Sequence, residues 1–379
     1  MMNDNIHLKK YFNKRSLHGL GKPFKKINKT AYQYIIVIPC YNEFDYIFDT
    51  LASINKQKSN LLEDTLVIIV INNSESDYLN VKENNNKTHQ SLIKKIYKYD
   101  FISIDCFSSK YQLTKNVAGV GYARKIGLDF ALEYALNSKS VLCCLDADTL
   151  IDDKYLDKIS YNYVINKIDV GIINFKHQKS NNPILEQGIR RYENILKEIA
   201  QNIEKTGSPY GYVSMGSTIT CNVKSYVACG GMNTKKATED FYFLQSLAKY
   251  TKIEKIKDIL VFPSSRNENR VYLGTGFRMG EYSKNKTFKN LDFNQDSYNQ
   301  LSKIIKIVKK NSMKDGEVIF KELSCQLNKK SISFLIEKKV ESILDKFKKN
   351  AKDIKQYNLF FNQWFDALTI MKFLKYLNN

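Results

Sequence analysis

The sequence predicts an α/β protein built around a largely parallel sheet that helices cover on both faces. Apolar runs of strand length, rich in β-branched residues, occur at residues 34–39, 66–71, 101–106 and 141–145. Segments with apolar residues at helical spacing separate most of these runs, for example after residue 43 and over residues 122–136. Strands that alternate with helices of this size are typical of a parallel sheet with two covered faces.

The remaining segments extend this pattern and mark its limits. We expect residues 1–30 to form a basic, loosely ordered extension, and the Asn-rich stretch at residues 76–90 to be a loop insertion. Further along, the pattern predicts a strand at residues 170–175, and helices at residues 152–166, 183–204 and from 239 onwards. From about residue 280 the sequence becomes Lys-rich and helical, which predicts a separate C-terminal region at residues 280–379.

Composition narrows the function classes. The net charge of +20 favours polyanionic partners, which are nucleic acid, an anionic membrane surface or phosphorylated substrates, although an AT-rich genome also enriches lysine. No apolar run approaches the roughly 20 residues of a membrane helix, and the first ten residues do not resemble a signal peptide. The seven cysteines form no Cys-x-x-Cys pair, so we expect reduced thiols and a cytoplasmic protein.

The most informative motif is Asp146-Ala147-Asp148, which directly follows the predicted strand at residues 141–145. Ligands of α/β sheets bind beyond the carboxyl ends of strands. Neighbouring carboxylates repel each other unless a cation or hydrogen-bond donors stabilise them, and Mg²⁺ takes one or two carboxylates together with phosphate oxygens. The motif therefore predicts a metal–diphosphate site, with simple capping of the next helix as the alternative.

Three other segments carry residues suited to the same chemistry. Residues 38–43, Ile-Pro-Cys-Tyr-Asn-Glu, end the first strand and could face a nucleoside. The glycine-rich turn that includes Gly121 enters a helix and brings N–H groups and Arg124 towards phosphates. Glu239 and Asp240 begin a predicted helix, where a carboxylate serves either as a cap or as a base that accepts a proton from a hydroxyl.

Together these segments resemble the family 2 glycosyltransferases. The matching elements, in the family's order, lie at residues 38–43, 121–128, 145–148, 230–231 and 238–240. The resemblance covers about residues 32–265. It implies the GT-A fold, which is a Rossmann-like mixed sheet with helices on both faces, in a catalytic domain at residues 31–279. It also implies transfer of a sugar from a nucleotide-diphosphate donor, UDP- or GDP-sugar, to a hydroxyl acceptor with inversion, and a Mn²⁺ or Mg²⁺ cofactor.

The resemblance also implies roles for individual residues. Asp148 would bind the metal, and Asp146 would approach the ribose or the metal. Asp240 would be the catalytic base, with Glu239 as the close alternative. The nucleoside would contact Pro39, Tyr41, Glu43 and the position of Asn73. The family commonly has an aspartate at the end of the second strand, where this chain has Asn72-Asn73, so a uracil preference is less secure.

Two further groups of residues complete the expected site. Arg266 and Arg270 precede Gly274, and we expect these arginines to hold the diphosphate when a mobile segment closes, with a solvated turn as the alternative. Tyr212, Gly216 and Ser217 lie where the family usually builds its acceptor pocket. Packing is the alternative for the tyrosine, because the chain has 25 of them.

The sequence leaves other activities open. A nucleotidyltransferase on the same fold would carry a glycine-rich basic loop after its first strand, where this chain has residues 39–43. A nucleic-acid-binding protein is suggested by charge alone, and a retaining glycosyltransferase would remove the base role from Asp240. The basic region at residues 280–379 favours peripheral contact with an anionic membrane. The leading prediction is a metal-dependent, inverting glycosyltransferase.

Overall fold

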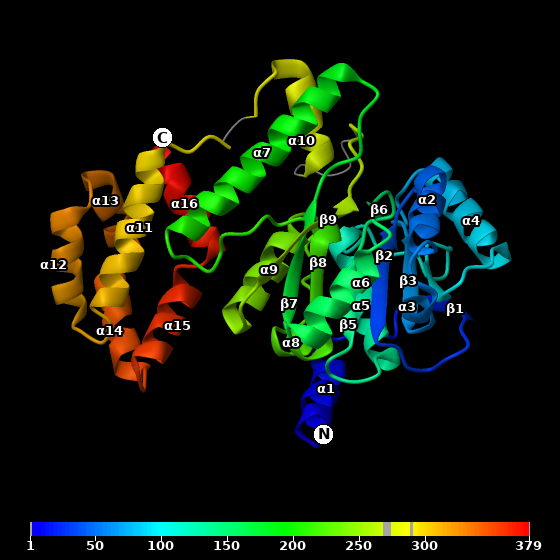
Figure 1. Ribbon diagram of the computed structural model, residues 1–379, viewed down its shortest axis with the longest axis horizontal. Helices are drawn as coiled ribbons and strands as arrows, with labels where there is room; N and C mark the ends of the chain where they lie inside the picture. Colours follow the sequence, from blue (N-terminus) through cyan, green and yellow to red (C-terminus); the bar gives the residue numbers. More distant parts are fainter. Residues whose placement is uncertain (1, 268–273, 289–290, 379) are drawn as a thin grey trace. The chain divides into compact units, whose positions relative to one another are not determined.

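The computed structural model describes residues 2–267, 274–288 and 291–378. Contacts divide the chain into two units, of which the first comprises Met1–Arg190 and Ser214–Lys284, and the second Arg191–Val213 and Asn285–Asn379. The first unit contains the sheet and the helices that cover it, and the second unit is helical (Figure 1).

The described strands form one mixed sheet in the order β1-β4-β3-β2-β5-β8-β7-β9-β6. The strands are β1 (Lys22–Lys26), β2 (Tyr34–Cys40), β3 (Thr65–Asn72), β4 (Asp100–Cys106), β5 (Val141–Cys144), β6 (Leu150–Ile151), β7 (Val170–Phe175), β8 (Ile219–Asn222) and β9 (Glu254–Phe262). Strands β4, β3, β2 and β5 are parallel, whereas β8 is antiparallel to both β5 and β7. The α/β class with a mixed sheet is confirmed, but the expectation of a largely parallel sheet is wrong for its second half.

The burial of the two central strands explains why their apolar runs predicted strands. Every residue of β2 and β3 is buried, as expected for strands covered on both faces. Helix α5 (Val120–Ala131) packs against them, and a Cβ on Gly127 would lie 2.4 Å from Cγ1 of Val37 and 2.9 Å from Cγ2 of Val70. Glycine at this position therefore brings the helix close to the sheet, which places the first turn of α5 at the edge where β5 ends.

The other helices of the first unit lie between these strands in the chain. They are α1 (Met2–Arg15), α2 (Phe44–Ile54), α3 (Ser59–Glu63), α4 (Leu79–Lys94), the 3-10 turn Leu132–Tyr134, α6 (Tyr155–Ser160), the π turn Tyr161–Ile165, the 3-10 turn Gly216–Thr218, α8 (Val223–Ala228), α9 (Glu239–Tyr250) and α10 (Thr275–Asn285). Helix α7 (Pro183–Lys205) continues into the second unit. The loop predicted at residues 76–90 is wrong, because most of it is α4. Asparagine has low intrinsic helix propensity, but Val81, Asn85 and Leu92 are buried and tertiary packing stabilises the helix.

The expectation of a loosely ordered extension at residues 1–30 is also wrong. Strand β1 pairs with β4 in antiparallel orientation and forms one edge of the sheet. Helix α1 is fixed by a buried cluster around Asp129 of α5. One carboxylate oxygen of Asp129 accepts hydrogen bonds from the hydroxyls of Tyr11 at 2.5 Å and Tyr226 at 2.7 Å. The other oxygen lies 3.0 Å from Nζ of Lys125 and accepts the backbone N–H of Leu17.

We expect Asp129→Ala to be strongly destabilising, because it leaves the buried Lys125 ammonium without its carboxylate. The side chains of Lys125 and Asp129 are 7% and 0% exposed. Removing one partner of such a pair costs about 3–5 kcal/mol in the free energy of unfolding, measurable by urea denaturation. The control is Asp64→Ala, because the pair of Lys29 with Asp64 is about half exposed and contributes at most about 1 kcal/mol. Equal losses in the two variants would contradict this account.

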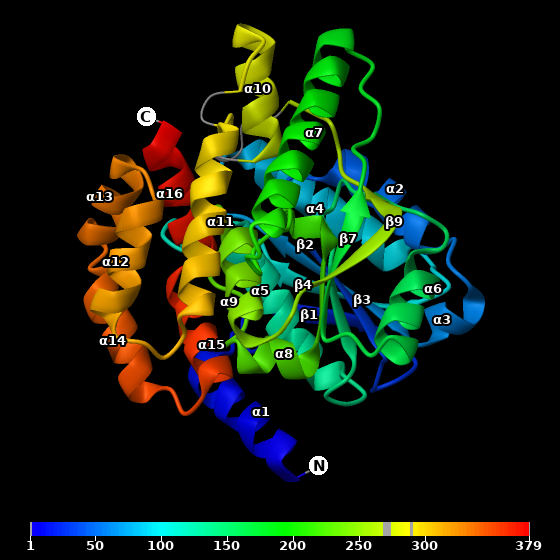
Figure 2. The same ribbon diagram turned by 60° about the vertical axis from the view of Figure 1, so that its left-hand side comes forward.

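The second unit is a helical assembly with its own core. Its helices are α11 (Gln295–Lys310), α12 (Gly316–Gln326), α13 (Lys329–Glu337), α14 (Val340–Asn350), α15 (Ile354–Trp364) and α16 (Ala367–Asn378) (Figure 2). The apolar stripe predicted from Leu301, Ile304, Ile305 and Val308 is buried. Trp364 lies among aromatic rings, with centroids 6.2 Å from Phe347 and 5.6 Å from Phe365, so it belongs to the packing of this region as expected.

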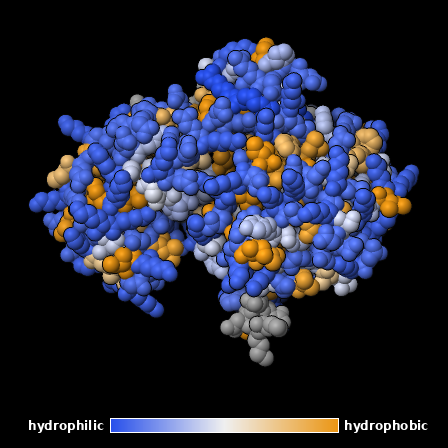
Figure 3. Space-filling model, viewed as in Figure 1, coloured by the Kyte–Doolittle hydropathy of each residue, from blue (hydrophilic) through white to orange (hydrophobic). Residues whose placement is uncertain are grey.

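On the face drawn in Figure 3, hydrophilic residues predominate and apolar residues form small separate groups. Among the helices of the described residues, none is both long and apolar enough to cross a bilayer. Docking of residues 280–379 on an anionic membrane stays a prediction.

Candidate active site

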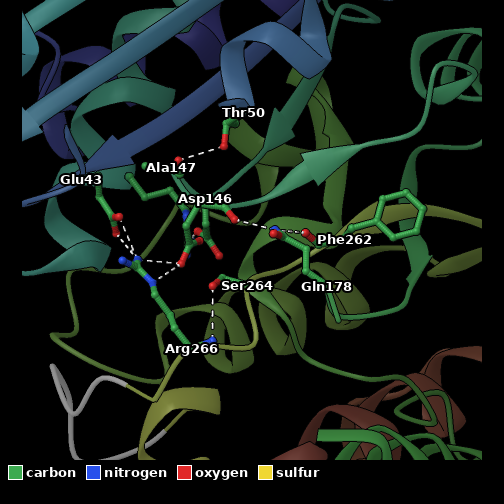
Figure 4. Close-up of polar contacts among 10 residues, drawn as sticks. Glu43, Thr50, Asp146, Ala147, Gln178, Phe262, Ser264 and Arg266 are labelled. Atoms are coloured by element: carbon green, nitrogen blue, oxygen red, sulfur yellow. Dashed lines mark hydrogen bonds and ion pairs between the residues drawn. The ribbon is translucent and has the colours of Figure 1, made fainter. Parts of the chain in front are cut away.

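The aspartate motif follows β5 in a loop whose backbone accepts hydrogen bonds from two side chains. The hydroxyl of Thr50, on α2, donates to the carbonyl of Ala147 at 2.9 Å. The side-chain amide of Gln178 donates to the carbonyls of Asp148 at 2.9 Å and Phe262 at 2.8 Å, which ties this loop to the end of β9 (Figure 4). The side chains of Asp146 and Asp148 remain 35% and 18% exposed. The backbone is therefore fixed while both carboxylates can reach a ligand.

Arg124 joins this motif to the start of α9. Its side chain is 2% exposed and comes from the first turn of α5. One terminal nitrogen donates to Oδ1 of Asp146, and the other donates to Oε1 of Glu239 at 2.5 Å. Three segments that the sequence separates widely thus meet in one buried charge cluster. Direct contact of Arg124 with a phosphate stays a prediction.

The pKa values in this cluster reflect burial and mutual attraction. Burial raises the pKa of Glu239 to about 7, although the Arg124 guanidinium favours the charged carboxylate. Burial also raises the pKa of Asp240, against the same attraction. Burial opposes the charge on Arg124, but the carboxylates of Asp146 and Glu239 raise its pKa above the ordinary value. Arg124 therefore stays charged throughout the working pH range.

Two glycines make room for this cluster. A Cβ on Gly216 would lie 2.6 Å from one terminal nitrogen of Arg124 and 2.7 Å from the other. A Cβ on Gly121 would lie 2.2 Å from the carbonyl oxygen of Lys235 and 2.9 Å from Cβ of Glu239. Both glycines thus allow close approach of backbone to the Arg124–Glu239 pair. This close packing explains why both positions are glycine, independently of any contact with a ligand.

Asp240 differs from Glu239 in its surroundings. Its side chain is half-buried, and its Oδ1 accepts the N–H of Phe241 at 2.7 Å. Within the described residues Asp240 makes no ion pair, whereas Glu239 is bound to Arg124. The preceding residue, Thr238, has a φ of 62°, in the left-handed region that a β-branched residue rarely adopts. Such strain is found where surrounding structure holds a functional residue in place.

A second arginine binds the other aspartate of the motif. Arg266 follows β9, and its Nη2 lies 2.6 Å and 2.8 Å from the two carboxylate oxygens of Glu43. Its Nε and Nη2 lie 2.9 Å and 2.7 Å from Oδ2 of Asp148 (Figure 4). The guanidinium also lies 4.1 Å from the ring centroid of Tyr46 on α2. The predicted nucleoside, metal and diphosphate residues therefore meet at one edge of the sheet.

Comparison with known proteins shows which family this part of the chain resembles. Residues 35–217 match the model of the family described as glycosyl transferase family 2. The chain is a glycosyltransferase whose residues 35–217 are similar to family 2. Its activity is therefore transfer of a sugar from a nucleotide-activated donor. No curated protein sequence is significantly similar to it.

Similar solved structures come from three organisms. The chain is similar to residues 1–349 of TarS from S. aureus in complex with UDP-GlcNAc, at 16% identity, 86% and 89% coverage of the two chains and a TM-score of 0.44. The mannosyltransferase PcManGT from Pyrobaculum calidifontis, in complex with GDP-Man and Mn²⁺, has 10% identity, 96% and 92% coverage and a TM-score of 0.43. Glucosyl-3-phosphoglycerate synthase from Mycobacterium tuberculosis has 11% identity, 70% and 74% coverage and a TM-score of 0.38.

The residues predicted to contact a nucleoside lie beside a network of amide side chains that the sequence did not reveal. Asn85 of α4 is buried, and its side chain accepts the N–H of Asn42 and donates to the carbonyl of Asn72 and to Oδ1 of Asn73. Asn73 donates in turn to the carbonyl of Ser74. Asn42, at a φ of 56°, is thereby fixed next to Glu43. The Asn-rich stretch was the available signal, but it was interpreted as a loop.

The remaining predicted residues lie in several parts of the chain. Pro39 is buried within β2, and Tyr41 is half-buried just beyond it. Gly216 and the buried Ser217 belong to the first unit, whereas Tyr212 belongs to the second. Arg270 lies outside the described residues. The acceptor assignment and the role of Arg270 stay predictions.

The residues at the end of β5 fit a divalent cation bound together with a diphosphate. Within the described ranges, no three His, Cys, Asp or Glu side chains are clustered closely enough to hold a metal ion alone. Mg²⁺ and Mn²⁺ sites of nucleotide enzymes commonly use one or two carboxylates, with phosphate oxygens and water as the other ligands. Asp148 and Asp146 supply two carboxylates, and the binding of Asp148 to a guanidinium shows that this position accepts positive charge.

Proposed function

We propose that this glycosyltransferase moves a sugar from a UDP- or GDP-sugar to a hydroxyl acceptor with inversion, with Mn²⁺ or Mg²⁺ held by Asp148 and Asp146. The observation that carries the proposal is the buried Arg124, which binds Asp146 of the donor motif and Glu239 beside the candidate base. This arginine holds Asp146 and the start of α9 within one cluster. A donor between them would meet a base on one side and a cation site on the other.

The proposed chemistry assigns the proton transfer to Asp240. The acceptor oxygen would attack the anomeric carbon, the bond from that carbon to the diphosphate oxygen would break, and the acceptor proton would pass to the Asp240 carboxylate. Asp240 is better suited than Glu239, because Glu239 is buried against Arg124. The bound cation would stabilise negative charge on the departing diphosphate. A base raised above the ordinary aspartate pKa by burial accepts a proton more readily.

The test is calorimetric titration of the purified chain with UDP-, GDP-, dTDP- and CMP-sugars, with Mn²⁺ and with chelator. We expect one nucleotide class to bind, and its binding to weaken strongly when chelator replaces Mn²⁺. Equal affinity with and without the cation would contradict the metal role. Absence of binding to every donor in the presence of Mn²⁺ would contradict the proposed donor specificity.

A further inference from the structure

Arg124 and Arg266 each bind one aspartate of the motif, Arg124 binding Asp146 and Arg266 binding Asp148. Arg124 is 2% exposed and is enclosed between Asp146 and Glu239. The Arg266 side chain is 18% exposed, and so is that of its partner Asp148. Arg124 belongs to helix α5, whereas Arg266 lies in a segment outside regular secondary structure, where a side chain changes its partners with less rearrangement of the backbone. Arg124 is therefore suited to permanent ion pairs, and Arg266 is suited to ion pairs whose partners exchange.

The segment that carries Arg266 is anchored next to the aspartate motif. Gln178 donates through its backbone N–H to the carbonyl of Pro263 at 2.9 Å, and its side chain binds the carbonyls of Phe262 and Asp148. Phe262 also pairs with Leu150, two residues after Asp148. Residues 263–267 lie outside regular secondary structure. The base of the segment is thus fixed while the Arg266 side chain can exchange partners.

We propose that Arg266 is an internal cation that occupies the metal-binding carboxylate Asp148, together with Glu43, until the metal-bound donor displaces it onto the diphosphate. The inference rests on the proposed function, because it requires a metal at Asp148. It goes beyond a diphosphate contact, because it gives the same guanidinium a competing position in the donor-free protein. Asp148 then faces a cation at all times, first the arginine and afterwards the metal.

The chemistry of the groups favours this exchange. The guanidinium presents several N–H donors in a fixed plane, which bind carboxylate and phosphate oxygens equally well. Arg266 uses Nη2 for both oxygens of Glu43 and Nε with Nη2 for Asp148. A divalent cation competes for the same Oδ2 of Asp148 and leaves the arginine without one partner. A nearby diphosphate supplies the replacement.

The test compares two affinities that the exchange moves in opposite directions. We expect Arg266→Gln to bind Mn²⁺ alone about tenfold more tightly than the wild type, measured from free Mn²⁺ by electron paramagnetic resonance. We expect the same variant to bind UDP in saturating Mn²⁺ about tenfold more weakly. Arg266→Lys keeps the charge but not the planar geometry, so both of its affinities should lie between those of the wild type and those of Arg266→Gln. It takes the place of Arg266→Gln in the test if the glutamine variant does not fold. Arg278→Gln, which removes a comparably exposed arginine paired with Glu281, is the control and should change neither affinity.

Hydrogen exchange supplies a readout that does not depend on activity. Addition of Mn²⁺ and UDP to the wild type should accelerate or slow amide exchange in peptides covering residues 262–267, and the change should be lost in Arg266→Gln. If the wild type and Arg266→Gln bind Mn²⁺ equally and exchange in residues 262–267 stays constant, the inference is overturned and the proposed function stands. If neither Mn²⁺ nor UDP binds to any variant, both are overturned.

Discussion

Replacement of Asp240 by Asn is expected to lower kcat about a thousandfold with little change in donor affinity. An amide of the same shape cannot accept the acceptor proton, and general base catalysis contributes about 10²–10⁴ in rate. Asp240 carries no ion pair in the described part of the chain, so its removal leaves Arg124 bound to Asp146 and Glu239. Release of nucleoside diphosphate, followed with and without acceptor, measures the effect.

The matched variant is Glu239→Gln, which removes the charge beside the base. We expect it to keep part of the turnover, because Asp240 is unchanged and Arg124 stays bound to Asp146. The reverse result, with turnover abolished in Glu239→Gln and kept in Asp240→Asn, would assign the base to Glu239.

The two carboxylates also predict the dependence on pH. The base must be ionised, and burial raises the pKa of Asp240, so kcat/KM should fall on acidification at a pH above the ordinary aspartate range.

The stability of the folded protein should depend on pH in the opposite direction. Because the pKa of Glu239 rises from 4.5 to about 7 on folding, the folded protein binds more protons in that window and loses stability as pH rises through it. Glu239→Gln should remove this slope in urea denaturation measured across the window.

Replacement of Asp148 by Ala is expected to abolish Mn²⁺-dependent donor binding and to lower kcat/KM about 10²–10³-fold. Loss of one preorganised group that stabilises a departing anion typically costs this much. Calorimetry with the donor and Mn²⁺ measures the binding. Asp153→Ala is the control, because Asp153 is exposed and lies five residues further along the same chain segment. If both variants bound the donor as the wild type does, Asp148 would not be a metal ligand.

The sequence was most informative where one local pattern controls the structure. The apolar residues of β2 and β3 are buried on both faces, so their runs could be recognised without knowledge of their partners. The same reasoning placed Asp146 and Asp148 at the end of β5. It also correctly placed the start of α9 at Glu239, where acidic residues precede apolar residues at helical spacing.

The sequence was least informative where contacts between residues far apart in the sequence determine the structure. Helix α4 forms although its asparagines do not favour a helix, because Asn85 binds the ends of two strands. The edge strand β1 is exposed throughout and carries lysines, so no apolar pattern reveals it. The pairing of Arg124 with Asp146 and Glu239 joins residues 22 and 115 positions apart, and no periodicity reports such a contact.

The most direct test of the central claim is whether a metal at Asp148 lies next to the diphosphate of a bound donor. Mn²⁺ shortens the ³¹P relaxation times of phosphates in its immediate neighbourhood, so the measurement is ³¹P relaxation of UDP bound to the wild type and to Asp148→Ala. We expect strong relaxation of both phosphorus nuclei in the wild type and loss of it in the variant, with Asp153→Ala unchanged. Equal relaxation in wild type and Asp148→Ala would contradict a metal–diphosphate site at the end of β5.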